Sequence, residues 1–138
     1  MLFIFFILTM LTSPQTFSSP LDYNSLYLNP KSTKSEVIIF YNPLIPCERC
    51  HQTIDDIISI LKQNFKTKIN AYLININDHP SFIYHFNLQG ALNLVTIKIN
   101  DNATFGYRKL TNLQSEIFDP ISFKNQITEF INNSLYLN

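Results

Sequence analysis

Residues 37–41, Val-Ile-Ile-Phe-Tyr, form a continuous apolar run of β-branched and aromatic side chains. A short run without polar alternation is typical of a strand that is buried on both faces of a sheet. Pro43 and Pro46 follow the run, and proline cannot donate the backbone hydrogen bonds that a central strand needs. The sequence therefore predicts a central strand that ends before these prolines, in a sheet covered by helices on its faces.

A helical pattern follows the two prolines. Apolar side chains recur at the three- and four-residue spacing of a helix surface, at Cys50, Ile54, Ile57, Ile58, Leu61 and Phe65. This spacing predicts a helix over residues 47–65. We expect Cys50 on its buried side and Cys47 in its first turn.

The remaining elements alternate between strands and helices. We expect a strand over 68–76, a short helix over 79–88 closed by Gly90, a hairpin of 92–99 and 104–110 around residues 100–102, and a last helix carrying Phe123, Ile127, Phe130, Ile131 and Leu135. The order is strand, helix, strand, helix, hairpin, helix. It predicts an α/β fold of three layers, with a central mixed sheet of about four strands flanked by helices.

The composition indicates one domain and argues against one class of partner. The chain has 138 residues, of which 46% are hydrophobic, which is enough for a single core. Ten basic and ten acidic side chains cancel, and no basic stripe is present, so nucleic acid is not an expected partner. We assign residues 20–35 to an extended N-terminal segment and residues 36–138 to the folded domain.

The first 19 residues have the pattern of a signal peptide. An uncharged apolar run over residues 2–11 precedes a small, polar stretch over 12–19, and the run is shorter than the about 20 residues that cross a bilayer. No second apolar segment follows, so no transmembrane segment is expected in the mature chain. The alternative is a buried N-terminal helix. Export would place the protein in the endoplasmic reticulum lumen, the periplasm or the cell exterior, where disulfides persist.

Both cysteines of the chain stand three positions apart, at Cys47 and Cys50. A disulfide between them closes too short a loop to restrict the unfolded chain much, so stability alone explains it poorly. A helix start favours the thiolate, which predicts that Cys47 attacks other sulfur atoms and that Cys50, facing inward, resolves the mixed disulfide. Arg49 and His51 would add positive charge there, and Glu48 opposes it.

Two other readings of the cysteine pair stay open. In the first, the chain is a non-catalytic binding module whose disulfide is structural. In the second, Cys47 and Cys50 carry a metal or an iron–sulfur cluster. A zinc site is disfavoured because there is no second cysteine pair and because His51, His79 and His85 show no matching spacing. No cofactor and no metal is expected.

The segment from Val37 to Cys50 resembles the active-site strand and turn of the thioredoxin superfamily, and the order of elements from about 36 to 135 matches that fold. The resemblance implies a thiol–disulfide oxidoreductase that acts on cysteine-containing exported proteins through Cys47 and Cys50. Two features depart from the family. The loop before Cys47 is longer, and the family's cis-proline, whose loop pairs with the substrate backbone, is missing where Leu92 or Asn93 stands.

Within the superfamily, the chain resembles the lumenal domain of the gamma-type subunit of oligosaccharyltransferase. The shared features are a long proline-containing loop before the C-x-x-C motif and the helix end Tyr84-His-Phe-Asn-Leu88. This resemblance implies the oligosaccharyltransferase complex as a partner and a role in N-glycosylation. The known subunits continue into membrane helices, whereas this sequence stops at Asn138.

Overall fold

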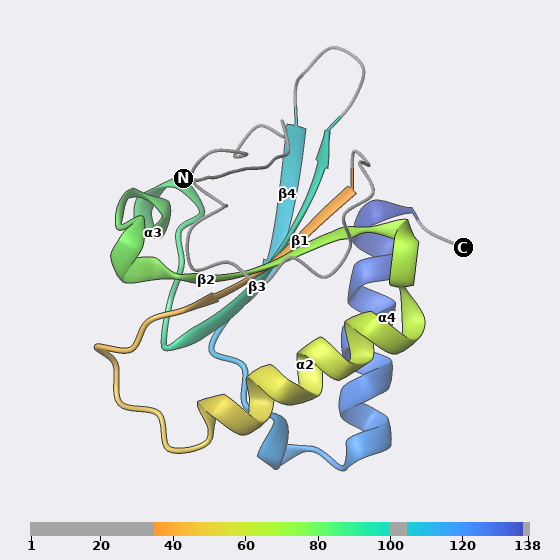
Figure 1. The fold of residues 1–138 in the computed structure, drawn as a ribbon, viewed down its shortest axis with the longest axis horizontal. Coiled ribbons are helices and arrows are strands. Elements are labelled where there is room, and N and C mark those ends of the chain that lie inside the picture. The colour runs from red at the N-terminus through yellow and green to blue at the C-terminus, as the bar shows by residue number, and fades with distance from the viewer. Residues whose placement is uncertain (1–34, 100–104, 137–138) are drawn as a thin grey trace, which may run out of the picture.

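The fold is seen in a computed structural model that describes residues 35–99 and 105–136. Its strands are β1 (Ser35–Tyr41), β2 (Asn70–Asn75), β3 (Leu92–Ile99) and β4 (Phe105–Leu110). Its α-helices are α2 (Cys50–Asn64), α3 (Ser81–His85) and α4 (Pro120–Leu135), with single 3₁₀ turns η1 (Lys66–Lys68), η2 (Ile76–Asp78) and η3 (Ser115–Ile117). Figure 1 shows the helices arranged around the sheet.

The described strands form one mixed sheet in the order β2-β1-β3-β4. β1 runs parallel to β2 and antiparallel to β3, and β3 runs antiparallel to β4. The parallel pair is joined by the crossover helix α2, as parallel strands require. β1, the first strand along the described chain, therefore lies inside the sheet with a neighbour on each side.

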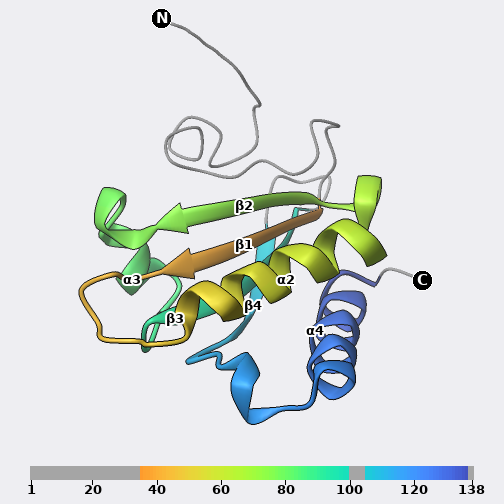
Figure 2. The same cartoon turned by 60° about the horizontal axis from the view of Figure 1, so that its bottom comes forward.

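Two apolar cores lie on opposite faces of the sheet. The α2/α4 core contains Val37 and Ile39 of β1 together with the buried sides of α2 and α4. The α3 core contains Ile38 and Phe40 together with side chains of β2, β3 and α3. Figure 2 shows α2 and α4 on one side of the strands and α3 on the other. Successive side chains of a strand point to opposite faces of the sheet. Val37 and Ile39 are therefore buried on one face of β1, and Ile38 and Phe40 on the other.

The predicted α/β fold of three layers, with a mixed sheet of four strands, is confirmed. The central strand and the last helix lie where the sequence predicted them, whereas the predicted helix over 79–88 is shorter and includes only Ser81–His85. The predicted hairpin turn at 100–102 and the predicted signal peptide lie outside the described residues. None of the helices in the described part of the chain is long and apolar enough to cross a membrane.

The last helix shows how local sequence fixes an element's start. Asp119 is the N-cap of α4 and its Oδ1 accepts a hydrogen bond of 2.8 Å from the Ser122 N–H. Pro120 occupies the first helical position, where no N–H is needed. The helix buries Phe123, Ile127 and Ile131 against the sheet. This fixed start aligns α4 beside α2.

Glu36 is a buried carboxylate in the middle of the sheet. It lies on β1 between Asn70 of β2 and Ile97 of β3 and has no exposed surface. Neither carboxylate oxygen accepts a hydrogen bond of ordinary geometry within the described residues, although the Tyr72 side chain comes near enough to stabilise the carboxylate weakly. Burial raises the pKa of Glu36 from 4.5 to about 7, and it outweighs the opposing effect of the Tyr72 side chain.

This raised pKa makes folding stability depend on pH. Below pH 4.5 Glu36 is protonated in both the folded and the unfolded chain, but between 4.5 and 7 only the unfolded chain ionises. The free energy of unfolding should therefore fall as pH rises through this window, by up to about 3 kcal/mol from this group.

We expect Glu36→Gln to remove this fall. The variant should gain up to about 3 kcal/mol relative to the wild type between pH 4 and pH 8, because glutamine does not ionise. Urea unfolding at both pH values measures the change, and Glu48→Gln, which alters an exposed carboxylate, is the matched control. If the unfolding free energies of Glu36→Gln and the wild type differ by the same amount at both pH values, the raised pKa of Glu36 is contradicted.

Candidate functional site: the Cys47–Cys50 disulfide

The loop between β1 and α2 carries the first cysteine and is ordered by Asn42. The Asn42 N–H donates to the Ala91 carbonyl at 2.8 Å, which extends the β1–β3 pairing by one residue. Asn42 Oδ1 accepts from the Leu44 N–H at 3.1 Å, and the Asn42 carbonyl accepts from the Ile45 N–H at 3.2 Å. These bonds close a β-turn with Pro43 at its second position, which proline favours. The turn directs the chain away from the sheet and toward Cys47.

Cys47 and Cys50 form a disulfide with a Cα–Cα distance of 5.5 Å. Every residue from 43 to 49 is exposed, including Cys47, whereas Cys50 is half-buried and packs against the α2/α4 core. An approaching sulfur atom therefore reaches Cys47 before Cys50. The two cysteines are unequal in the way that attack and resolution require.

The predicted helix start at residue 47 is wrong by three residues. α2 begins at Cys50, and its first backbone hydrogen bond runs from the Thr53 N–H to the Arg49 carbonyl at 3.0 Å. Arg49 has φ −114° and ψ 15°, which lies outside the helical region, so the helix does not extend back through it. Cys47 thus precedes the first turn, and Cys50 is the first residue of the helix.

The charged residues expected near the cysteines are all on the surface. Glu48, Arg49 and His51 are exposed, so His51 lies on the solvent side of α2. Within the described ranges no three His, Cys, Asp or Glu side chains gather as a metal site would require. The chemistry that the described geometry offers is the disulfide itself.

A buried hydroxyl pair fixes the first turn of α2, and sequence reasoning did not find it. Thr53 Oγ1 and Ser115 Oγ lie 3.0 Å apart, and the Ser115 N–H donates to Thr53 Oγ1 at 2.9 Å. Thr53 is fully buried and Ser115 nearly so. The turn η3 is therefore attached to the helix three residues after Cys50. Nothing in the sequence pairs residues 53 and 115, because the contact spans 62 positions.

The segment before β3 lies where the resemblance to the thioredoxin superfamily would place a cis-proline loop. The described peptide bonds are all trans, and Leu92 opens β3 opposite Tyr41. The Ala91 carbonyl accepts the Asn42 N–H, and the Leu92 carbonyl accepts the Leu113 N–H at 3.0 Å. Ala91 is only 7% exposed. Both carbonyls are therefore bonded within the protein.

Gly90 is required by its conformation and by its surroundings. Its φ of +75° lies in the left-handed region, which side chains disfavour. A Cβ atom at this position would lie 2.7 Å from Asn112 Oδ1. Gly90 therefore lets the segment before β3 approach the segment after β4 closely.

The architecture is similar to that of solved thioredoxin-fold structures. A protein from Edwardsiella tarda, Trxlp, superposes with a TM-score of 0.50 at 11% identity, covering 70% of this chain and 84% of that chain. This chain has a thioredoxin-like fold. The Trx4 domain of ERdj5 has a TM-score of 0.49 at 12% identity, covering 72% and 82% of the two chains, and chloroplastic thioredoxin z has 0.39 at 12%, covering 70% and 80%. No protein-family model and no curated protein sequence matches the chain.

Within this thioredoxin-like fold, exposure predicts which thiol reacts first. After reduction, we expect iodoacetamide at neutral pH to label Cys47 before Cys50, because Cys47 is exposed and Cys50 packs against the core. Peptide mass spectrometry over time measures both sites. Earlier labelling of Cys50 would reverse the assignment of attacking and resolving thiols.

The hydroxyl pair should contribute to stability. Thr53→Val leaves the Ser115 N–H and hydroxyl buried without their partner, which should cost about 1–3 kcal/mol of unfolding free energy. Thr128→Val is a matched control, because Thr128 is only half-buried and accepts a single side-chain bond, from Asn64. Urea unfolding of both variants gives the comparison. If both variants lose the same unfolding free energy, the buried Thr53 hydrogen bonds contribute no more than the half-buried bond of Thr128.

Proposed function

We propose that this protein is a thiol–disulfide exchange domain that acts on cysteine-containing exported proteins through Cys47 and Cys50. The observation that carries the proposal is the unequal exposure of the two bonded cysteines, with Cys47 exposed and Cys50 half-buried against the core. The thioredoxin-like fold supports it, because Cys47 follows the central strand and Cys50 begins the helix after it.

The exchange begins with the oxidised pair. A client thiolate attacks Cys47 Sγ, the Cys47–Cys50 bond breaks, and Cys50 leaves as a thiolate, so that client and Cys47 share a mixed disulfide. A second client thiolate then attacks the client sulfur and releases Cys47. The client loses two electrons and becomes a disulfide, and the cysteine pair gains them. The reverse sequence reduces a client disulfide and closes the Cys47–Cys50 bond again.

The proposal also includes a cellular location and a partner complex. The apolar run at residues 2–11 supports export into an oxidising compartment such as the endoplasmic reticulum lumen. The proline-containing turn at Asn42–Ile45 and the segment 84–88 support a role as a subunit of the gamma type in oligosaccharyltransferase. In that role the mixed disulfide would hold a client near the enzyme that glycosylates it.

A specific observation favours a second candidate function, a binding module with a structural disulfide. The Ala91 carbonyl is already bonded to Asn42, so the backbone site that thioredoxin-like proteins use for clients is partly occupied. The two functions differ in reduction potential. A redox-active pair equilibrates near the potential of its compartment, whereas a structural disulfide resists reduction to below about −300 mV.

Substitution of single cysteines tests the proposed function. We expect Cys50→Ser to accumulate covalent complexes with exported proteins, because Cys47 attacks a client disulfide in the reductive direction and the mixed disulfide then has no Cys50 thiol to resolve it. Cys47→Ser should form none. Non-reducing gels of both variants in the native host, with the double variant as control, provide the measurement. The binding module takes precedence if Cys50→Ser traps no partner and the wild-type disulfide stays closed at −300 mV.

A further inference from the structure

An apolar patch lies on the surface where η3 leads into α4. It consists of Ile117, which is 68% exposed, Phe118 at 37% and Ile121 at 73%. Figure 1 and Figure 2 show this connection between β4 and α4, near the start of α2. Nowhere else in the described ranges do three exposed large apolar side chains stand within five positions. We call these three side chains the η3 patch.

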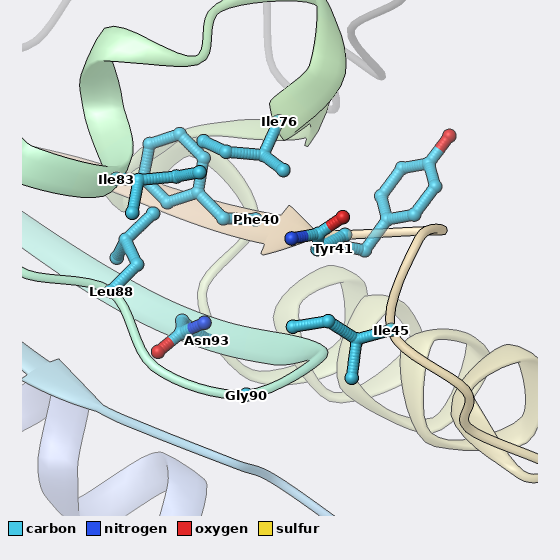
Figure 3. A pocket seen from close by; sticks show the side chains of 9 residues that line it. Phe40, Tyr41, Ile45, Ile76, Ile83, Leu88, Gly90 and Asn93 are labelled. Carbon is cyan, nitrogen blue, oxygen red and sulfur yellow. The ribbon is translucent and has the colours of Figure 1, made fainter.

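The exposed apolar side chains of the cysteine loop are a different case. Ile45 is 38% exposed and lines a small pocket together with Leu88 and Asn93, as Figure 3 shows. Its neighbour Leu44 is then a single exposed side chain. Single apolar residues are normal on a protein surface, whereas a contiguous patch marks a site of interaction. The η3 patch therefore calls for a partner more strongly than the loop does.

The η3 patch reverses the usual placement of polar and apolar side chains. The turn buries the hydroxyl of Ser115 and leaves Ile117, two residues later, in the solvent. The buried hydroxyl needs a partner, which Thr53 Oγ1 provides at 3.0 Å. On α4, Ile121 stands about 200° around the helix from the buried Phe123, away from the side that packs on the core. The core of the protein thus makes no use of these isoleucines.

Bonds on both sides hold the patch in one shape. The Ser115 N–H donates to Thr53 Oγ1 at 2.9 Å, and the Phe118 N–H donates to the Ser115 carbonyl at 3.1 Å. The Phe118 ring lies 6.0 Å from the ring of the buried Phe123, and Asp119 caps α4 directly after it. A surface that already has its bound shape loses little conformational entropy when a partner binds.

The size of the patch indicates what kind of partner it fits. Large side chains bury at most about 250 Å² each, so three of them supply less than the about 800 Å² that each partner contributes to a standard interface. A second copy of this chain or another folded domain would need more surface than this. The patch suits a short segment of another chain that carries two or three apolar side chains.

Acidic side chains give the patch a preferred charge on its partner. Glu116 lies directly before it and Asp119 within it, and both are exposed. The N–H and hydroxyl of Ser122 donate to Asp119 and lower the pKa of its carboxyl, so Asp119 is ionised at neutral pH. Lys124 adds one positive charge a helical turn further along. Lysine or arginine beside the apolar side chains of a partner would complement this surface, whereas an anionic membrane would not.

We propose that the η3 patch binds a short segment of a partner protein in which two or three aliphatic or aromatic side chains are flanked by lysine or arginine. The apolar side chains cover Ile117, Phe118 and Ile121, and the basic ones lie against Glu116 and Asp119. The interaction goes beyond the proposed function, because it uses neither sulfur atom and does not depend on whether the disulfide is closed.

Four labelled peptides test the chemistry of the partner. They combine leucine and phenylalanine, or serine in their place, with either lysine or glutamate as the flanking residues. Fluorescence anisotropy with the oxidised wild-type protein should show the tightest binding for the apolar peptide with lysine, and about tenfold weaker binding when either feature is replaced. High salt should weaken the binding, since the charges are exposed. Backbone amide shifts in NMR should be confined to residues 115–124.

Matched substitutions locate the binding on the patch. Ile117→Ser and Ile121→Ser should each weaken the binding of the apolar lysine peptide about tenfold. Tyr84→Ser, which removes an 86% exposed side chain on α3, should leave it unchanged. Glu116→Lys should weaken it severalfold, whereas Glu129→Lys, at an exposed position further along α4, should not. All of these side chains are exposed, so the fold should tolerate the changes.

A separate readout distinguishes this inference from the proposed function. Ile121→Ser in the Cys50→Ser background should trap clients as before, and binding of the apolar lysine peptide supports the patch even if Cys47 proves unreactive. Equal binding of all four peptides, or binding that survives Ile121→Ser, would overturn the inference. So would two other occupants, each lost in Ile117→Ser: vesicles of phosphatidylcholine, which indicate a membrane surface, or self-association that rises with protein concentration, which indicates a second copy.

Discussion

The burial of β1 on both faces is the constraint on which the rest of the structure depends. Val37 and Ile39 need one apolar cover, and Ile38 and Phe40 need another, so helices must lie on both sides of the sheet. α2 and α4 provide the first cover and α3 contributes to the second. With a hydrogen-bonded strand on each side as well, β1 can move little. Its carboxyl end, where the cysteine loop begins, is thereby a fixed point.

Much of this arrangement was predictable from the sequence because the signals are local. Unbroken apolar runs predicted the central strand, and a period of three to four residues predicted α2 and α4. The start of α2 was wrong because periodicity reports which face is buried and not where the helical dihedrals begin, which here depends on Arg49. Glu36 was not recognised as buried, since a charged residue at the start of a strand normally marks its exposed end.

Of the candidate site, only the Cys47–Cys50 pair could be predicted from the sequence. The spacing of Cys47 and Cys50 was visible, but the contacts that position them join residues far apart in the sequence. Thr53 meets Ser115, and Asn42 meets Ala91, through bonds that only the folded chain brings together. The absence of the cis-proline was visible too. Its consequence was not, because the sequence does not show that the Ala91 carbonyl would be bonded within the protein.

Gly90 has a consequence for how the chain can diverge. A Cβ atom at position 90 would lie 2.7 Å from Asn112 Oδ1, the end of a side chain in the segment after β4. The Leu113 N–H, one residue further, is bonded to the Leu92 carbonyl. Among relatives of this protein, position 90 should therefore stay glycine whatever stands at 112, because a φ of +75° strains a side chain even where space is free.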